Sequence, residues 1–384
     1  MIACVPMSRV ISRSASLLLA LNLLGGCSMF RHVSVEPLAT GAQRPSNVGA
    51  FVSVRDGDEP LTELSPGNFK VYENEQLVPS DQTQLTLLDV SQVAGSQVVL
   101  LLDMSAATTP EQRSLVAKGA LNFVQKVTMR APVAVFMFDG GEALIPVATL
   151  PRGSQNLTMA AVESYSSRDK SRNLNGAVVA GIGRLTTLLA QTGKPIKLGM
   201  LVLYASGPDV AGRADRDKAH DAVWESNYDT LAIGAGEQVD VAQDLARQGI
   251  VRAQAPDTLP IAFEEAADRT LGELQRHYLV SYCSPARAGS RKLRLEVSYT
   301  TKEGDERHGD FETEFSAKSF GPGCNSAVAP RLTLVPKEPV VVDEPSSGKT
   351  SAEPKRKPAP RDSREHDQGE DAPVAPPDQG GYAK

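Results

Sequence analysis

The hydrophobic pattern of this chain is most regular between residues 97 and 275. Solid apolar runs of strand length alternate there with segments whose apolar residues recur every three to four positions. Continuous apolar strands followed by helices predict an α/β fold with a doubly wound, mainly parallel sheet covered on both faces. The predicted strands cover residues 98–102, 133–138, 198–204 and 230–234, and the predicted helices cover residues 111–127, 177–189, 215–225, 239–248 and 261–274.

Shorter, alternating patterns flank this central domain, which we assign to residues 96–276. Residues 49–95 contain runs of β-forming residues separated by turn sequences such as Asp56-Gly57, which predict a small antiparallel β unit. Residues 277–324 contain an apolar run and then a strictly alternating segment at 292–299. They predict a β extension after the α/β domain.

The segments outside these units lack a regular pattern. Residues 27–48 combine small polar residues with Pro and Gly, and we interpret them as a tether. Residues 325–384 lose apolar periodicity and fill with Pro, Lys, Glu, Asp and Ser. Such a composition buries too little apolar surface to offset chain entropy, so we expect a disordered tail.

An apolar run near the N-terminus ends at a cysteine. The run follows Arg9 and Arg13, covers residues 15–24, and is too short to span a bilayer as a helix. With Leu24-Gly25-Gly26-Cys27 it resembles the signal peptide and lipobox of bacterial lipoproteins. The resemblance implies cleavage of residues 1–26, acylation of Cys27 with chains such as palmitate, and a membrane anchor in the cell envelope. Ser28, which stands where that family has Asp in proteins kept at the inner membrane, implies the outer membrane.

Composition and cysteine usage fit an exported, folded protein. The 384 residues are 41% hydrophobic and 22% charged, which suffices for one or two cores, and the net charge of −6 disfavours nucleic-acid binding. Cys4 lies in the signal segment and Cys27 at the acylation position, which leaves Cys283 and Cys324. An even pair in an oxidising compartment predicts a disulfide, and two separate buried thiols are the alternative.

Candidate chemistry lies where the predicted strands end, because ligands of open α/β sheets bind at the carboxyl edge. The first run ends in Asp103-Met104-Ser105-Ala106-Ala107, and three further segments follow in order: residues 172–177 open a helix, residues 206–209 follow the third strand, and residues 228–234 contain the fourth strand. This ordered set resembles the von Willebrand factor A domain over residues 97–280. The resemblance implies that fold and a divalent cation bound by an Asp-x-Ser-x-Ser loop, a Thr and an Asp.

Measured against that family pattern, this chain keeps two of five ligands. Asp103 and Ser105 match, whereas Ala107, Arg172 and Ser206 replace oxygen ligands. Hard cations need several oxygen ligands, and a guanidinium adds positive charge, so we expect no tightly bound divalent cation and no other cofactor. Asp103 is expected to pair with Arg172 instead. The alternative is a shifted register in which Ser171 and Asp209 restore coordination.

These features favour a non-catalytic, membrane-anchored module that binds or scaffolds another protein. The five histidines do not accompany a Ser or Cys in a nucleophile motif, and the sequence has no glycine-rich phosphate loop. Two alternatives remain open. One is metal-dependent adhesion through a weakened cation site, and the other is a phosphoryl-transfer enzyme with Asp103 as the acceptor.

Overall fold

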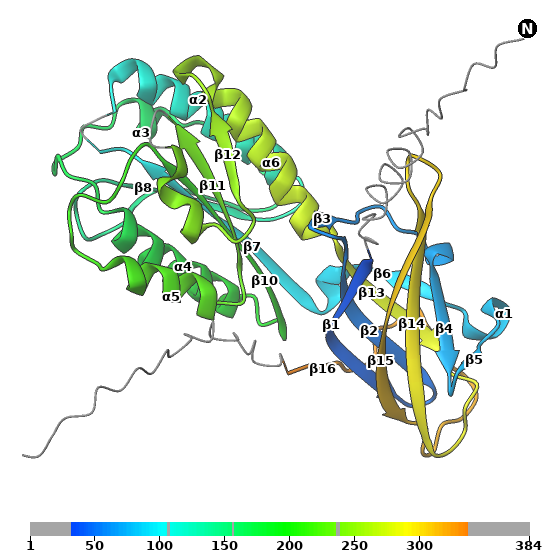
Figure 1. Cartoon of the computed structure of the whole chain (residues 1–384). Coiled ribbons are helices and arrows are strands. Elements are labelled where there is room, and N and C mark those ends of the chain that lie inside the picture. The colour runs from blue at the N-terminus through cyan, green and yellow to red at the C-terminus, as the bar shows by residue number, and fades with distance from the viewer. Residues whose placement is uncertain (1–31, 106–107, 156, 236–238, 337–384) are drawn as a thin grey trace, which may run out of the picture. The chain divides into compact units, whose positions relative to one another are not determined.

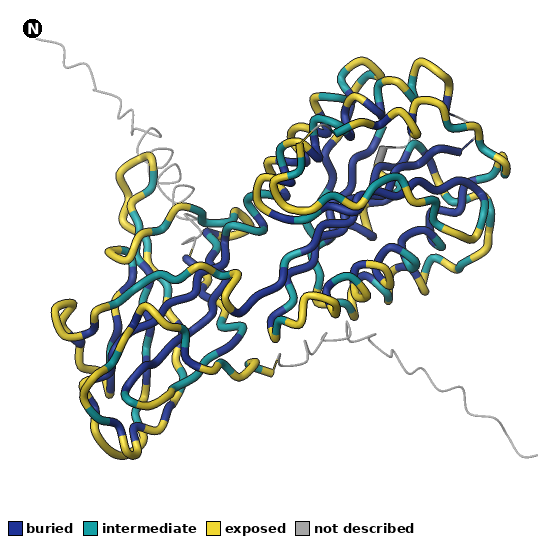
Figure 2. Tube along the Cα trace, turned by 180° about the vertical axis from the view of Figure 1, so that it is seen from behind, coloured by how far each residue is buried: buried dark blue, intermediate teal, exposed yellow. Residues whose placement is uncertain are grey.

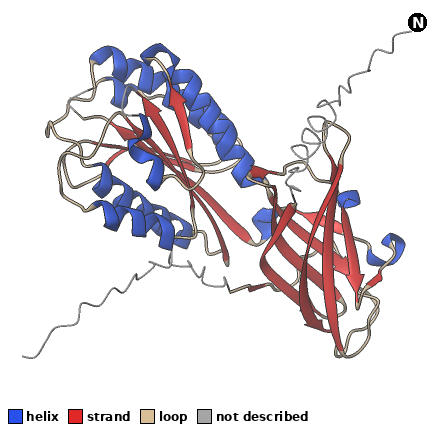
Figure 3. Ribbon diagram, in the orientation of Figure 1, coloured by secondary structure: helices blue, strands red, loops and turns tan. Residues whose placement is uncertain are grey.

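The structure, a computed structural model, describes residues 32–336 except for residues 106–107, 156 and 236–238 (Figure 1). These residues form an α/β lobe, built from residues 94–275, and a β lobe, built from the segments before and after it (Figure 3). The predicted signal peptide, Cys27, Ala107 and the tail from residue 337 lie outside the described residues. Within the described part of the chain, no helix has the length and apolar character needed to cross a bilayer.

The α/β lobe is built on a six-stranded sheet. Its strands are buried almost without interruption at the centre (Figure 2), as expected for a sheet covered on both faces. All neighbours run parallel except β9, an edge strand that was not predicted because its half-exposed residues form no continuous apolar run. In spatial order the strands are β12 (Ile250–Ala253), β11 (Asp229–Ala235), β10 (Ile196–Ala205), β7 (Ala94–Asp103), β8 (Val133–Phe138) and β9 (Ile145–Leu150).

Helices cover both faces of this sheet, which confirms the predicted fold class (Figure 3). Thr109 caps the first long helix in a capping box with Gln112, and Pro110 occupies the first turn. The helix predicted over residues 239–248 is instead a 3-10 helix at Val239–Leu245. One face packs against α2 (Pro110–Val127), α3 (Ala160–Glu163) and α6 (Leu259–Gln275), and the other against α4 (Leu174–Gln191) and α5 (Arg216–Glu225).

The winding direction of the sheet reverses between β7 and β10. The chain proceeds outward from β7 through β8 and β9, then returns to β10 and proceeds outward through β11 and β12. In such sheets ligands bind outside the carboxyl ends of the two central strands, at the topological switch point. Asp103 ends β7 and Ser206 directly follows β10, so both residues lie at this point.

The β lobe is a sandwich of two sheets whose strands come from both sides of the α/β lobe in the sequence. Strand β13 lies between β2 and β6, and β14 lies between β15 and β4. The N-terminal β unit and the C-terminal extension, predicted as separate, are therefore one lobe, since neither buries its apolar face alone. The first sheet contains β16 (Thr333–Leu334), β1 (Val33–Gln43), β2 (Asn47–Asp56), β13 (His277–Cys283), β6 (Thr86–Leu88) and β3 (Glu59–Pro60), and the second contains β15 (Glu306–Ser316), β14 (Ser290–Thr300), β4 (Phe69–Glu73) and β5 (Gln76–Leu77). The lobe also holds the short helix α1 (Ser80–Thr83) and 3-10 turns at Pro66–Asn68 and Val90–Gln92, and a third such turn, Pro256–Thr258, precedes α6.

The tether prediction was wrong for residues 33–48, which form β1 and the start of β2. Val33 and Val35 alternate with exposed residues and face the sandwich core. The Pro and Gly residues that indicated a linker have roles within β1, which pairs with β2 along its length and with β16 only at Ala39 and Thr40. The register shifts after Pro37, and a Cβ on Gly41 would lie only 2.0 Å from the carbonyl oxygen of Arg331.

The tail prediction was also wrong for its first residues, because residues 324–335 pack against the start of β2 and then along β1. We call this segment the C-terminal strap. It includes β16, and Val335 N donates to the Leu38 carbonyl at 3.0 Å. A Cβ on Gly49 would lie 2.7 Å from the Pro330 ring, so this second glycine also permits a close approach of the strap. The strap contains few apolar residues and is held mainly by backbone contacts, so the hydrophobic pattern of the sequence did not predict it.

Helix α6 leads into β13 through a buried polar cluster between the two lobes. Arg276 donates to Asp229 at 3.1 Å, and Arg55 of β2 pairs with Glu273 of α6. The next residue, His277, is buried and stacks on Phe51. Burial, together with the positive charge of Arg276, lowers the pKa of His277 to about 3. The imidazole is therefore neutral at pH 7.

Candidate functional site

Four of the five residues singled out at the carboxyl edge meet at the topological switch point. Asp103 and Ser105 come from the end of β7 and its loop, Ser206 follows β10, and Arg172 directly precedes Asn173, the N-cap of α4. All but Ser206 are buried. The parallel strands and the start of α4 thus bring together residues that are up to 103 positions apart.

The guanidinium of Arg172 is the centre of this cluster. Its Nε donates to Asp103 Oδ2 at 2.6 Å, and its Nη2 donates to the Oγ atoms of Ser105 and Ser206, each at 3.0 Å. Nη1 donates to the Pro208 carbonyl at 3.1 Å. Gly207 permits this approach, because a Cβ there would lie 2.6 Å from Nη1. The side chains that match or replace cation ligands therefore surround a cationic group supplied by the chain itself.

The carboxylate of Asp103 has hydrogen-bond partners on both oxygens. Oδ2 accepts from the backbone N and the Oγ of Ser206, at 3.0 and 2.7 Å, in addition to Arg172, and Oδ1 accepts from Ser105 N at 3.1 Å. Asp103 is 0% exposed and Arg172 is 7% exposed. This buried, hydrogen-bonded ion pair confirms the predicted contact between Asp103 and Arg172.

The low-dielectric surroundings also affect the tyrosine next to the site. Burial, followed by the negative charge of Asp103, raises the pKa of Tyr204 well above its ordinary value. Tyr204 belongs to β10 and packs against Phe263 of α6, with ring centroids 5.6 Å apart. Its hydroxyl therefore stays protonated over the physiological pH range.

Ser171 and Asp209, the residues that a shifted register would make cation ligands, form hydrogen bonds outside the Arg172 cluster. Ser171 Oγ donates to Asp169 Oδ1 at 2.7 Å. Asp209 accepts from Asn175 N, in the first turn of α4, at 2.8 Å and from Gly212 N at 2.9 Å. Neither side chain has a hydrogen bond to Asp103 or Arg172 among the contacts of the described residues.

A second carboxylate of this edge was missed by the sequence analysis. Asp139 follows β8, is buried, and accepts from Tyr165 Oη at 2.7 Å, Ser167 Oγ at 3.1 Å and Gly141 N at 2.8 Å. Burial opposes ionisation, but these hydrogen bonds outweigh it and lower the pKa of Asp139. Its place directly after the apolar run 133–138 is the same signal that identified Asp103.

These contacts give Asp139 a structural role. It fastens the loop that contains Tyr165 and Ser167 to the end of β8, next to the loop that carries Arg172. Asp169 lies in the same loop and accepts from Ser171. It also accepts from Arg213 Nη2 at 2.6 Å, which connects this loop to the segment before α5. The hydrogen bonds from Ser171, followed by that from Arg213, lower the pKa of Asp169 to about 2.

Metal-ligating side chains are dispersed in the described part of the chain, where no group of three or more His, Cys, Asp or Glu residues lies close enough to hold a metal ion. At the switch point itself Asp103 Oδ2 and the Oγ atoms of Ser105 and Ser206 all accept hydrogen bonds from Arg172. A dication at this point would have to displace a buried guanidinium and accept fewer oxygen ligands than hard cations require. The donor set therefore does not fit Mg²⁺ or Ca²⁺.

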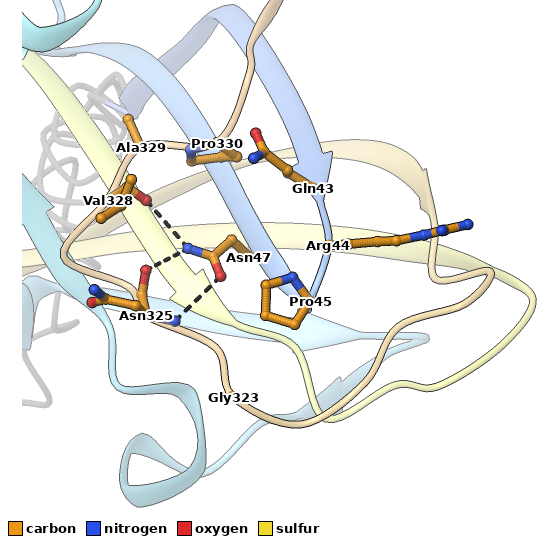
Figure 4. Close-up of a pocket in the computed structure, with 9 residues that line it drawn as sticks. All are labelled: Gln43, Arg44, Pro45, Asn47, Gly323, Asn325, Val328, Ala329 and Pro330. Carbon is orange, nitrogen blue, oxygen red and sulfur yellow. Dashed lines mark hydrogen bonds between the residues drawn. The ribbon is translucent and has the colours of Figure 1, made fainter.

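The predicted disulfide is confirmed, and it lies in the β lobe. Cys283, at the end of β13, bonds to Cys324, where the C-terminal strap begins, with Cα atoms 5.8 Å apart. A pocket of about 170 Å³ lies next to Cys324 and is lined by its sequence neighbours Gly323 and Asn325. In it, Asn47 donates to the carbonyls of Asn325 and Val328 and accepts from Asn325 N (Figure 4). The side chain of Asn47 thus spans the turn of the strap. Both features fasten the strap to the sandwich.

Comparison with known proteins finds only distant structural similarity, with TM-scores below 0.4. No family model and no curated protein match the chain. Among solved structures, proximal thread matrix protein 1 of the mussel byssus is 14% identical with a TM-score of 0.37, over 46% of this chain and 48% of that one. The chain therefore matches about half the length of the mussel protein, for which one structure has a zinc-occupied MIDAS motif.

Two further solved structures are similar over more of the chain. A von Willebrand factor type A protein from Catenulispora acidiphila is 13% identical with a TM-score of 0.36, over 75% of this chain and 74% of that one. The manganese-loaded TRAP protein of Plasmodium vivax is 9% identical with a TM-score of 0.37, over 65% and 99%. The strand order of this chain, rather than these alignments, shows that its larger lobe is a doubly wound α/β fold.

Proposed function

We propose that this protein is a lipid-anchored module of the bacterial cell envelope whose α/β lobe binds or scaffolds a partner protein without a cation and without catalysis. The observation that carries this proposal is the position of Arg172. Its guanidinium fills the topological switch point, where a doubly wound sheet otherwise receives a ligand.

Electrostatics support binding without a cation. Arg172 supplies one positive charge and hydrogen bonds to the same oxygens that a dication would need. A divalent ion in contact with this group would meet direct repulsion in a medium of low dielectric constant. The loops of the edge are thus held by the chain's own side chains, and a partner contacts their outer surface rather than a shared metal.

The burial of Asp103 supports the absence of phosphoryl transfer. A nucleophilic carboxylate needs an oxygen that an incoming phosphorus atom can reach. Asp103 is 0% exposed, and both of its oxygens accept hydrogen bonds. The described residues around it offer no general acid or base in hydrogen-bond contact, only Arg172 and two serines.

Calorimetry tests the proposed independence from cations. We expect no binding heat when Mg²⁺, Mn²⁺ or Ca²⁺ is titrated into the folded protein. The matched control is Ala107→Ser/Arg172→Thr/Ser206→Asp, which restores the ligand types of the family pattern and removes the guanidinium. Binding to the control but not to the wild type supports the proposal, whereas tight binding to the wild type that is lost in Asp103→Ala contradicts it.

Crosslinking in the native envelope tests the binding role. We expect one partner to be captured equally well with and without a chelator, and to be lost when exposed residues of the carboxyl-edge loops, such as Val210, are replaced by Glu. Capture that requires divalent cations would favour metal-dependent adhesion. Trapping of the purified protein with beryllofluoride, abolished in Asp103→Asn, would favour the phosphoryl-transfer alternative.

The anchor is tested separately at Cys27. We expect the mature protein to begin at this residue and to carry acyl chains, detected by mass spectrometry of the intact protein. In Cys27→Ser the protein is expected to leave the membrane fraction, because two or more acyl chains are what makes anchoring stable. A wild-type chain that is recovered unacylated would refute the anchor.

A further inference from the structure

The tether between the proposed lipid anchor and the folded protein is shorter than the sequence pattern indicated. Strand β1 begins at Val33, only six residues after Cys27. A polypeptide extends at most about 3.3–3.6 Å per residue, so the start of β1 stays within about 20 Å of an acylated Cys27. Covalent geometry alone sets this limit.

The strand register identifies which part of the β lobe this limit holds near the membrane. Val33 pairs with Asp56 at the end of β2, which continues into the β2–β3 turn. The hairpin of β14 and β15, whose turn covers residues 301–305, lies beside it, because a Cβ on Gly309 would lie 1.8 Å from the Val33 carbonyl oxygen. Asp56 joins the three segments by accepting from Tyr299 of β14 and Arg307 of β15. We call residues 56–60 and 300–306 the anchor end.

The anchor end is acidic and carries no apolar group that would enter a bilayer. All residues of its two segments are described, and none of the exposed large apolar side chains belongs to them. Its exposed basic residue is Lys302. Its exposed acidic residues are Asp58, Glu59, Glu303, Asp305 and Glu306.

We propose that the anchor end faces the lipid headgroups and is held off from anionic ones by charge repulsion, within the limit that the tether sets. This inference rests on the proposed acylation of Cys27. Repulsion acts over about one Debye length, which is about 30 Å at 0.01 M salt and about 8 Å at 0.15 M. At low salt the repulsion therefore extends beyond the reach of about 20 Å set by the number of residues between Cys27 and β1, and at higher salt we expect the β lobe to move closer to the bilayer.

The opposite end of the sandwich points away from the bilayer as a consequence. Strand β14 has 11 residues, which corresponds to about 35 Å at the usual rise per residue. The disulfide and the C-terminal strap's attachment at Cys324 lie at the end where β14 begins and β15 ends. This end remains accessible to a partner in the surrounding compartment.

Energy transfer from two matched label positions to headgroup-labelled lipid tests this orientation. Lys302→Cys places a donor on the anchor end, and Lys318→Cys places it just after β15, at the opposite end of the same strand pair. The experiment uses the full-length acylated protein in anionic vesicles. We expect transfer from position 302 to exceed that from position 318 several-fold. Equal transfer, or greater transfer from position 318, would overturn the proposal.

Salt and tether length provide two further arms. Raising the salt from about 0.01 M to about 0.5 M shortens the Debye length to a few ångströms. We expect transfer from position 302 to increase on anionic vesicles and to stay constant on zwitterionic ones. Inserting about ten Gly and Ser residues after Ser28 adds about 35 Å of reach and is expected to abolish the difference between the two positions. A difference that survives the insertion unchanged would contradict the role of the short tether.

The outcome also separates this inference from the proposed anchor. A chain that carries no acyl group on Cys27 overturns both. An acylated chain that floats with the vesicles, but shows equal transfer from the two positions, overturns the orientation alone.

Discussion

Replacing Arg172 by alanine tests whether the switch point is held by a buried ion pair. The substitution removes the donors of four hydrogen bonds and leaves Asp103 charged in a site with no solvent exposure. Removing one partner of a buried pair costs about 3–5 kcal/mol, because the other charge stays desolvated without compensation. Since folded domains are stable by about 5–15 kcal/mol, this is a large fraction of the total.

The assay is urea unfolding of the mature protein followed by circular dichroism and by Trp224 fluorescence, with the free energy extrapolated to water. Arg213→Ala is the matched control. It breaks the contact with Asp169 in the same set of loops, but those side chains are 39% and 32% exposed, so we expect a much smaller loss. The double variant Asp103→Asn/Arg172→Met should recover part of the stability lost in Arg172→Ala.

A loss below about 1 kcal/mol for Arg172→Ala would refute this reasoning, because values of that size are typical of solvated surface pairs. The same result would weaken the proposed function, which depends on a guanidinium that stays at the switch point. Additive effects of Asp103→Asn and Arg172→Met would likewise contradict a direct pair, since residues in contact show coupling energies of about 0.5–3 kcal/mol.

The remaining predictions concern the β lobe and one helix. The double variant Cys283→Ala/Cys324→Ala should lose about 2–4 kcal/mol in calorimetry, because the bridge closes a loop with a sequence separation of 41. The free energy of unfolding should fall as the pH drops from about 6.5 towards 3, by up to about 1.4 kcal/mol per pH unit. The reason is that His277 binds a proton in the unfolded chain, whereas in the folded protein, where its pKa is about 3, it stays neutral. Urea unfolding measured over this pH range tests the prediction, and an equal slope in His277→Phe would disprove it. Gly41→Ala should speed proteolysis within the C-terminal strap, since the new Cβ would collide with its backbone. Gly183→Ala, exposed within α4 and with no atom near the new Cβ, should instead raise the unfolding free energy by about 0.5–1 kcal/mol, and a decrease would contradict the packing described here.

The sequence alone predicted the fold class of the α/β lobe and its four inner strands, β11, β10, β7 and β8, but neither edge strand. The inner strands are solid apolar runs and the long helices are amphipathic, so local periodicity reports both their type and their burial. The same logic placed Asp103 and Ser206 at one sheet edge, because parallel strands present their carboxyl ends together. The pair of Cys283 and Cys324 followed from counting cysteines.

Only the tertiary structure decided how the first and last of the described segments are organised and which residues other than Asp103 surround Arg172. Residues 33–43 carry Pro37 and Gly41, which suggest a linker, yet they form a strand because β2 and the sandwich core lie beside them. The two predicted β units likewise form one sandwich, because strands from before and after the α/β lobe pair with each other. The sequence predicted that Arg172 pairs with Asp103, but the further contacts of its guanidinium with Ser105, Ser206 and Pro208, each more than thirty residues away in the sequence, were found only in the structure. Such long-range contacts have no local signature, because the pattern along a chain records which residues are buried but not which residues bury them.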